Sequence, residues 1–327
     1  MLGIRISKHE GILRRAIRAI TRQKAVVAIL IMLFVMLFFD TKFFTSYNLL
    51  DMLKSAAIIE IIAFGVTLTI LCGGVDFSVG GTMSLSGIIV IKLMSMMPLW
   101  SAIVIAVLVG ALIGFVNGFF VVQQKTEPFI ITLGMGILLK GLGQQLTDAH
   151  PISASSMQLM KIANGKTFGS IPNLIIYMIV FFIAIHILLR YTSFGRNCYA
   201  IGGDYEVAAY SGINATRIKW TTYILSGVIA AIGGVLLASK LNTASSLYGD
   251  TTALTVNCGV VVGGTSFAGG VGGIPQTFVG VLALQMLKNC MNMLGISAYI
   301  QQVFEGVLIL AIIWSDSFSR KRKREAV

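Results

Sequence analysis

One stretch of the sequence combines glycines with a single carboxylate between two long apolar runs. Residues 73–81 read GGVDFSVGG, and the apolar runs cover residues 56–72 and 79–97. Glycine adopts positive φ without strain, so Gly73 or Gly74 can end the first helix. Asp76 can accept the backbone N–H of Ser78 or Val79 and start the next helix. The stretch predicts either a capped cytoplasmic turn or an irregular segment beside a transport path, where a membrane tolerates such backbone and a carboxylate.

A second stretch, residues 190–220, is polar and suited to contact with another surface. Asp204 is suited to the N-cap of a short helix, Glu206 complements its N-terminus and Gly212 is suited to its end. This helix of two turns has a small face at Ala208 and Ala209. Because so short a helix is marginally stable alone, it is expected to rest either on the membrane surface or in a groove of a partner protein.

Two further carboxylates, Glu60 and Glu305, lie inside apolar runs. A carboxylate in lipid is costly, so each is expected to face protein or water. Glu60 is expected near the outer end of its helix and near Lys54, with a paired structural role and substrate contact as the alternatives. The cysteines and histidines are scattered, and no nucleophile, base or metal-ligand set converges. We therefore expect no catalytic residue, no metal and no cofactor.

The composition is that of an all-α polytopic membrane protein. Hydrophobic residues make up 56% of the 327 residues, charged residues only 12%, and the mean hydropathy is +0.87. The apolar residues form runs long enough to cross a bilayer as helices, without the alternation of a β-barrel. About ten spans are expected, at residues 25–39, 56–72, 79–97, 100–122, 129–147, 173–190, 221–239, 253–264, 274–293 and 299–314.

The formal net charge of +12 is concentrated near the ends of the spans. Basic residues gather in 1–24, 122–128, 190–220 and 315–327, which predicts that both termini are cytoplasmic and argues against nucleic acid as a partner. Residues 1–24 are expected to form a cytoplasmic basic interfacial helix on membrane lipid. Residues 25–316 are expected to form the transmembrane domain, with 190–220 as its main cytoplasmic loop. Residues 317–327 are expected to form a cytoplasmic basic tail.

Small residues predict where helices pack closely and where one is broken. Gly110, Gly114 and Gly118 recur every four residues in the span 100–122, which lets another helix approach closely. The span 253–264 is too short to cross as a straight helix, so a broken helix is expected there. The glycine motifs 73–81 and 263–273 each interrupt a span, which suggests a weak internal repeat without a convincing alignment of the two halves.

Three stretches together resemble the permeases of ribose-type ABC sugar importers. Residues 70–80 are similar to the family signature GGIDLSVG, with Val75 and Phe77 in place of Ile and Leu. Residues 262–272 (VGGTSFAGGVG) and 200–213 (AIGGDYEVAAYSGI) are the second and third stretches, with Asp204 where the family more often has Asn. The likeness runs from about residue 48 to residue 314.

The resemblance implies a function for each motif. The first and last stretches would line the gate or translocation path, and residues 203–212 would form a coupling helix that docks on an ATPase. The path residues are Gly73, Gly74, Asp76, Ser78, Gly80, Gly263, Gly264, Thr265, Ser266, Gly269 and Gly270. The coupling residues are Gly203, Asp204, Glu206, Ala208, Ala209 and Gly212.

The resemblance also implies partners. These are a cytoplasmic ABC ATPase, an extracytoplasmic sugar-binding protein and a second permease subunit, identical or related, in the plasma membrane of a bacterium. The expected substrate is a monosaccharide. Uptake of a nucleoside or a branched-chain amino acid is an alternative. An ion-coupled secondary transporter is less suited, because Glu60, Asp76 and Glu305 are the only intramembrane carboxylates expected. A structural scaffold would leave both glycine motifs without a role.

Overall fold

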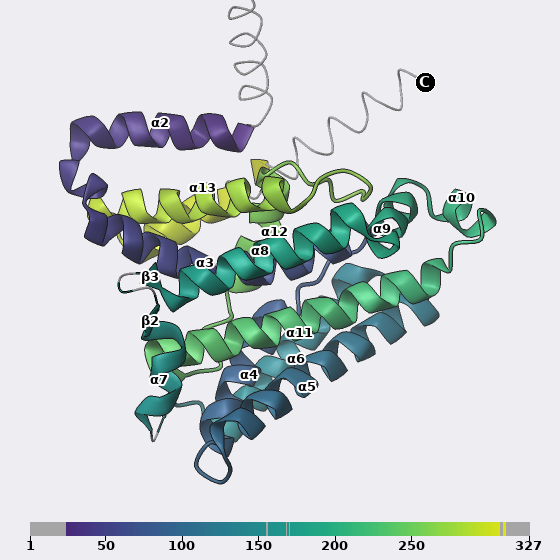
Figure 1. Cartoon of the computed structure of the whole chain (residues 1–327), viewed down its shortest axis with the longest axis horizontal. Helices are drawn as coiled ribbons and strands as arrows, with labels where there is room; N and C mark the ends of the chain where they lie inside the picture. The colour runs from purple at the N-terminus through teal and green to yellow at the C-terminus, as the bar shows by residue number, and fades with distance from the viewer. Residues whose placement is uncertain (1–23, 155, 168, 170, 308–309, 312–327) are drawn as a thin grey trace, which may run out of the picture.

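The computed structural model describes residues 24–154, 156–167, 169, 171–307 and 310–311. The expected interfacial helix at 1–24, except for its last residue, and the expected basic tail lie outside these residues. The described chain is almost entirely helical, and its long helices run side by side (Figure 1). One end of the bundle carries α9 (Ser193–Gly203) and α10 (Tyr205–Tyr210), and we call it the α10 end. The opposite end carries α7 (Met157–Asn164), and we call it the α7 end.

The remaining elements follow the chain in a simple order. The helices are α2 (Lys24–Phe39), η1 (Thr41–Phe44), α3 (Ser46–Leu71), α4 (Val79–Leu93), α5 (Leu99–Gly118) with its π-helical extension η2 (Phe119–Gln123), α6 (Pro128–Thr147), α8 (Asn173–Tyr191), α11 (Ala215–Leu241), α12 (Thr252–Val262) and α13 (Ile274–Met293). Residues 298–307 are also helical. Two small antiparallel ladders join β1 (Ile152–Ser153) to β4 (Thr243–Ala244) and β2 (Lys166–Thr167) to β3 (Ile171–Pro172).

Within the described part of the chain, five helices are long and apolar enough to cross a membrane. They are α3, α5 with η2, α6, α8 and α11. Residues 25–39, α4 and α12 are apolar but shorter. The polytopic, all-helical class is therefore confirmed, whereas the count of ten spans and the cytoplasmic termini stay predictions. The stretch 190–220, expected to be mainly a loop, is mostly helical, because α9, α10 and the start of α11 occupy it.

Helices α3 and α11 form the centre of the bundle. They run antiparallel, since Gly65 of α3 packs against Ser226 and Ile229 of α11 while Gly233 packs against Ile62. The main hydrophobic core surrounds α3 with side chains from α8, α11, α12 and α13. The expected close packing of the glycine ladder in α5 is confirmed, because a Cβ added at Gly110 or at Gly114 would overlap the backbone of α11.

Helix α4 begins in the middle of the bundle instead of at its end. Asp76, just before α4, contacts Ser226 near the middle of α11, whereas Gly87 packs beside Ala238 near the end of α11. Helix α4 therefore runs from the middle to the α7 end, and residues 73–78 bring the chain back into the bundle. A capped turn in the cytoplasm, one of the two interpretations of this stretch, is wrong for that reason.

Helix α12, like α4, begins in the middle of the bundle, but it runs in the opposite direction. Its eleven residues, Thr252–Val262, confirm that this span is short. Gly249, just before α12, packs against the backbone of Gly80, so the two short helices begin close together near the middle of the bundle. Helix α12 then runs to the α10 end, where residues 263–273 reach Leu71.

The element order contains an inverted repeat. In the first half α3, a non-helical return, α4 and α5 follow one another, and in the second half α11, a non-helical return, α12 and α13 do so in the opposite direction (Figure 1). The return at 73–78 therefore corresponds to the return at 242–251. The repeat suspected between 73–81 and 263–273 is wrong in its pairing, because 263–273 joins α12 to α13 as residues 94–98 join α4 to α5.

Candidate functional site

The three glycine motifs meet at the α10 end of the bundle. The Gly270 N–H donates to the carbonyl of Leu71, the last residue of α3, at 3.0 Å. A Cβ added at Gly202 would overlap both groups, so α9 lies directly on this contact. Gly73, Gly269 and Gly270 have φ of +68°, +89° and +71°, a region that other residues rarely adopt. Glycine is therefore required for both backbone conformation and close approach, and we call this contact the glycine junction.

Asp76 is completely buried and joins three helices. Its Oδ1 accepts hydrogen bonds from the backbone N–H of Ser78 at 3.0 Å and from the Ser78 hydroxyl at 2.6 Å, and its Oδ2 accepts one from Ser226 of α11 at 2.7 Å. Asn117 of α5 donates to Ser78 Oγ at 2.8 Å, and Asn257 of α12 donates to the Asp76 carbonyl at 3.1 Å. The predicted bond from the Ser78 N–H is confirmed. The surrounding network holds the return segment in place.

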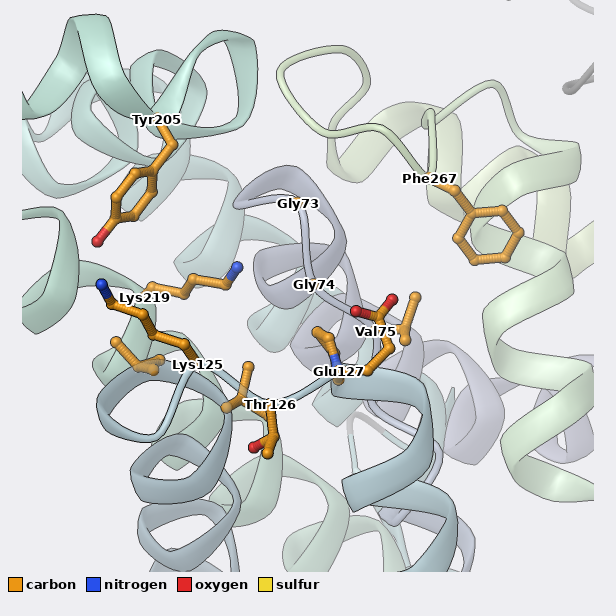
Figure 2. A pocket seen from close by; sticks show the side chains of 12 residues that line it. Gly73, Gly74, Val75, Lys125, Thr126, Glu127, Tyr205, Lys219 and Phe267 are labelled. Carbon is orange, nitrogen blue, oxygen red and sulfur yellow. The ribbon is translucent and has the colours of Figure 1, made fainter.

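A pocket of about 490 Å³ opens at the α10 end beside the glycine junction (Figure 2). It is lined by Gly73, Gly74 and Val75 of the first motif, Tyr205 of α10 and Phe267 of the third motif. The pocket thus brings residues from all three motifs to one space, although more than 190 residues of sequence separate the first from the last. We call it the α10-end pocket.

The charged residues of the α10-end pocket come from two other elements. Lys125, Thr126 and Glu127 lie on the loop between η2 and α6, and Lys219 lies on α11. In Figure 2 the Lys125 and Lys219 side chains lie on the same side as Tyr205, opposite Phe267. Lys125 has φ of +53°, and the π-helical turn before it is a feature often found at functional sites. The two lysines of the pocket therefore lie beside Tyr205, and Phe267 lies on the opposite side.

The helix predicted at residues 204–211 forms as α10, with the predicted ends. Asp204 Oδ1 accepts the N–H of Val207 at 3.0 Å, and Gly212 ends the helix with φ of +81°. The small face is divided, however, because Ala208 is buried within the chain and Ala209 is exposed. Tyr210 beside it is 90% exposed, so α10 presents Ala209 and aromatic side chains outward.

Helix α9 connects α10 to the glycine junction. Tyr199 of α9 donates its hydroxyl to the Gly272 carbonyl at 2.9 Å. Burial raises the pKa of the Tyr199 phenol, so the group stays a neutral donor at physiological pH. Gly203, the last residue of α9, has open space around the position of a Cβ, although its backbone lies against Gly270 in the close contact.

Hydrogen bonds within the loop 263–273 fix its conformation. Ser266 N–H donates to the Val271 carbonyl at 3.0 Å, and Ser266 Oγ accepts the Ala268 N–H at 3.2 Å. Thr265 is buried, and a Cβ at Gly263 would overlap the backbone of α13 at Gln276. Of the predicted path residues only Gly73 and Gly74 line the α10-end pocket, and Gly80 instead packs at the start of α12. The predicted path residues therefore form two groups, at the junction and in the middle of the bundle.

The two carboxylates singled out inside apolar runs have different surroundings. Glu60 is fully buried and lies fourteen residues into α3, near the middle of the helix instead of near its outer end as expected. Neither carboxylate oxygen of Glu60 has a hydrogen-bond partner among the described residues, so the suggested pairing with Lys54 is not found there. Glu305 is paired, with Lys288 of α13 at 3.1 Å, and Thr255 of α12 donates a hydrogen bond to it.

Several polar residues of the interior escaped the sequence reasoning. Asn117, Ser226 and Asn257 complete the network at Asp76, and Lys140 pairs with Asp250 at 2.8 Å. The sequence feature that could have identified them is a single polar residue within an apolar run, as at Asn117, Lys140 and Asn257. Asp250 gave no such signal because it was expected in an external loop. Asp250 is a further carboxylate in the middle of the bundle, because its neighbour Gly249 packs against Gly80.

The fold and the site define a helical membrane protein of the transport class, because two broken spans and three glycine motifs surround a pocket at one end of the bundle. Comparison with known families identifies this class further. The chain belongs to the family described as branched-chain amino acid transport system / permease component, whose model matches residues 48–313.

Individual relatives cover nearly the whole chain. The ribose import permease protein RbsC of Haemophilus influenzae is 33% identical over 94% of this chain and 96% of its own length. RbsC of Bacillus subtilis is 36% identical over 89% and 91%, and the galactose/methyl galactoside import permease protein MglC of Escherichia coli is 31% identical over 91% and 94%. These relatives confirm the resemblance to ribose-type import permeases. No solved structure matches the chain.

Proposed function

We propose that this chain is the membrane-spanning permease subunit of an ABC importer for a monosaccharide. The observation that carries the proposal is the convergence of the three motifs, from α3, α9–α10 and the loop after α12, on the α10-end pocket. The relatives named for ribose and galactose import favour a sugar over the branched-chain amino acid in the family description. A nucleoside is less favoured for the same reason.

The partners follow from this class. A permease component of an ABC importer works with a separate ATPase and with a binding protein that delivers the substrate. We assign α10 to the ATPase, because Ala209 and Tyr210 are exposed on a capped helix at one end of the bundle. The α10 end is then cytoplasmic, and the α7 end receives the binding protein. A second permease subunit, identical or related, completes the transporter.

The geometry supports a route for coupling. Helix α10 continues through Asp204 into α9, and α9 lies on the glycine junction, where Gly202 contacts Leu71 and Gly270. Leu71 is followed directly by the return segment that contains Asp76. Movement of α10 on an ATPase would therefore reach the return segment through close backbone contacts with no flexible side chain in between. We assign the path residues named in the sequence analysis, which lie within 73–80 and 263–270, to the translocation path and its control.

Transport by the assembled complex tests the proposal. The permease, its ATPase and its binding protein would be reconstituted in proteoliposomes, and uptake of radiolabelled D-ribose, D-galactose and D-allose measured with and without ATP. We expect ATP-dependent uptake of at least one of these sugars that requires the binding protein. Uptake driven by a proton or sodium gradient without ATP would contradict the proposal and favour a secondary transporter. ATP-dependent uptake of leucine or a nucleoside alone would contradict the sugar assignment.

A further inference from the structure

A second cavity lies about halfway along the bundle, farther from the α10 end than the α10-end pocket. Its volume is about 310 Å³, within the range of roughly 300–1,000 Å³ that ligand pockets have. It lies where α4 and α12 begin, beside α6, and its lining includes Phe77, Phe129, Lys140, Ser246 and Asp250. We call it the central chamber. Phe77, together with Gly80 and Gly81 of the lining, lies in the first glycine motif, and the other lining residues lie outside the motifs discussed above.

The central chamber contains an ion pair in the middle of the bundle. Lys140 Nζ lies 2.8 Å from Asp250 Oδ2. Lys140 is twelve residues after Pro128, the first residue of α6, so it lies about 18 Å along a helix about 30 Å long. Asp250 is two residues before α12, which itself begins in the middle. A charge at this depth is expensive in lipid, so such a pair marks protein-lined or water-lined space.

Lys140 and Asp250 keep free hydrogen-bonding positions in addition to the contact between them. The side chains of Lys140 and Asp250 are 37% and 43% exposed in the chain. An ammonium group has three donors and a carboxylate about four acceptor positions, and the single contact between them occupies one of each. The free positions can therefore bind a ligand that carries both donors and acceptors close together, as the hydroxyl groups of a sugar do.

An aromatic pair forms the wall between the two cavities. Phe77 and Phe129 pack edge to face, with ring centroids 5.1 Å apart. Both rings line the central chamber, whereas Val75 and Pro128, close to them in sequence, line the α10-end pocket. The same two chain segments, the return segment and the start of α6, thus border both cavities. The aromatic pair offers an apolar surface to a ligand in the chamber and lies next to the segments that border the α10-end pocket.

We propose that the central chamber is a transit site that holds one monosaccharide, with Lys140 and Asp250 hydrogen-bonding its hydroxyl groups and Phe77 and Phe129 packing on the apolar face of its ring. The site rests on the proposed function and adds where the sugar binds within the membrane. Release to the α10-end pocket then requires Phe77 and Phe129 to separate. Since Phe77 immediately follows Asp76, the return segment controls this wall.

The chain offers a matched control for a purely structural ion pair. Lys288 and Glu305 are also paired, at 3.1 Å, between α13 and the helical residues 298–307. Their side chains are less exposed, at 31% and 15%, and neither lines the central chamber or the α10-end pocket. A variant of this pair therefore reports what loss of an interior ion pair does to the fold alone.

The first experiment measures binding without relying on activity. In a variant lacking Cys72, Cys198, Cys258 and Cys290, Ser246→Cys places a thiol in the chamber and Ser101→Cys places one on the exposed start of α5. The reconstituted complex is labelled with a small charged thiol reagent during turnover. We expect a saturating transported sugar, D-ribose in the first trial, to slow labelling at position 246 at least threefold and to leave position 101 unchanged. Equal rates at position 246 with and without a sugar that the same complex transports would overturn the proposal.

The second experiment separates binding from structure. Asp250→Asn and Lys140→Met are compared with Glu305→Gln and Lys288→Met in purified complexes. We expect the chamber variants to lower sugar transported per ATP hydrolysed by about tenfold while ATP hydrolysis stays within twofold, and the control variants to keep the wild-type ratio. A wild-type ratio in both chamber variants would overturn the transit site. Failure of the proposed function is distinguishable, because it would appear as an absence of sugar uptake by the wild-type complex.

Discussion

At the scale of single residues, Asp76 is the group whose environment says most about function. Each of its carboxylate oxygens accepts a hydrogen bond, and the donors come from Ser78 and from Ser226 of α11. No cation pairs with Asp76 among the described residues, where the ion pairs are Lys140–Asp250 and Lys288–Glu305. The network alone therefore compensates for burial of this group. The question is whether the protein needs the charge or only the hydrogen bonds.

Substitution of Asp76 answers that question. Asn can keep the bonds from Ser78 at its carbonyl, and its amide can donate to the Ser226 hydroxyl, so Asp76→Asn should insert and keep its melting temperature. Asp76→Ala leaves buried donors unpaired at a cost of about 1–3 kcal/mol each and should lower the melting temperature. We predict that both variants lose uptake, because the charge controls the return segment.

Thermal melting of the purified protein and sugar uptake by the complex check this prediction. The exposed carboxylate Asp51 of α3 supplies the control, since Asp51→Asn should change neither quantity. Full uptake by Asp76→Asn would show that Asp76 acts only through its hydrogen bonds.

At the scale of elements, α10 has the properties of a docking helix. It is six residues long, capped by Asp204 and ended by Gly212, and only Ala208 is buried. A helix this short gains little stability from its own hydrogen bonds, so the contacts of Ala208 with Ile201 and Ala215 hold it in place. Its outward face is therefore preformed for a partner, and the glycine junction at Gly202 lies directly before α10 in the chain.

A single charge on the outward face tests the docking assignment. Ala209→Arg should leave the fold intact, because Ala209 is exposed, and should abolish ATP hydrolysis stimulated by the binding protein, because a long side chain would enter the interface. Gln158→Arg on the exposed face of α7 is the matched control at the other end of the bundle and should retain stimulation. Wild-type transport by Ala209→Arg would mean that α10 lies on the membrane instead of on the ATPase.

At the scale of the whole molecule, the inverted repeat places two half-length helices with their N-termini close together in the middle of the bundle. Helix α4 leaves this point toward the α7 end and α12 toward the α10 end, and the central chamber lies beside the point where they begin. Broken spans at the binding site are a common solution in transporters, because interrupted helices expose backbone groups within the membrane. In the proposed mechanism, movement of these short segments would give the chamber access to both ends.

Orientation in the membrane is a property of the whole molecule that the described residues leave to experiment. Basic residues lie at both ends, for example Arg196 and Arg217 at the α10 end and Lys92 and Lys161 at the α7 end. The expected excess of basic residues on the cytoplasmic side depends on residues 1–24 and 315–327, which lie almost entirely outside the described part of the chain.

Cysteine labelling determines the orientation. In a background without native cysteines, Gln158→Cys at the α7 end should react with an impermeant thiol reagent added to intact cells, and Ser211→Cys at the α10 end should not. Permeabilised cells provide the control, because both positions are exposed and should then react. Labelling of Ser211→Cys from outside intact cells would place α10 away from any ATPase and contradict the model of ten spans with cytoplasmic termini.

The sequence by itself determined the properties that depend on neighbouring residues. Long apolar runs predicted the helical membrane class, because burial in lipid depends on the composition of about twenty consecutive residues. Asp204 and Gly212 predicted both ends of α10, and Asp76 the bond from the Ser78 N–H, because capping acts over two or three residues. The small-residue ladder in α5 predicted close helix packing for the same local reason.

Only the tertiary structure decided which distant residues share a site. Nothing local to Gly73, Gly202 or Gly270 shows that they touch, or that Lys140 pairs with Asp250. Hydropathy detects the apolar part of a helix and misses its more polar ends. The first ten residues of α3 were therefore left out of the span, and Glu60 was expected near the end of a helix whose middle it occupies. The non-helical return before α12, which contains Asp250, was missed for a similar reason. A return into the bundle is stabilised by buried partners such as Ser226 and Asn257, which lie far away in the sequence, so it forms only when the helices pack.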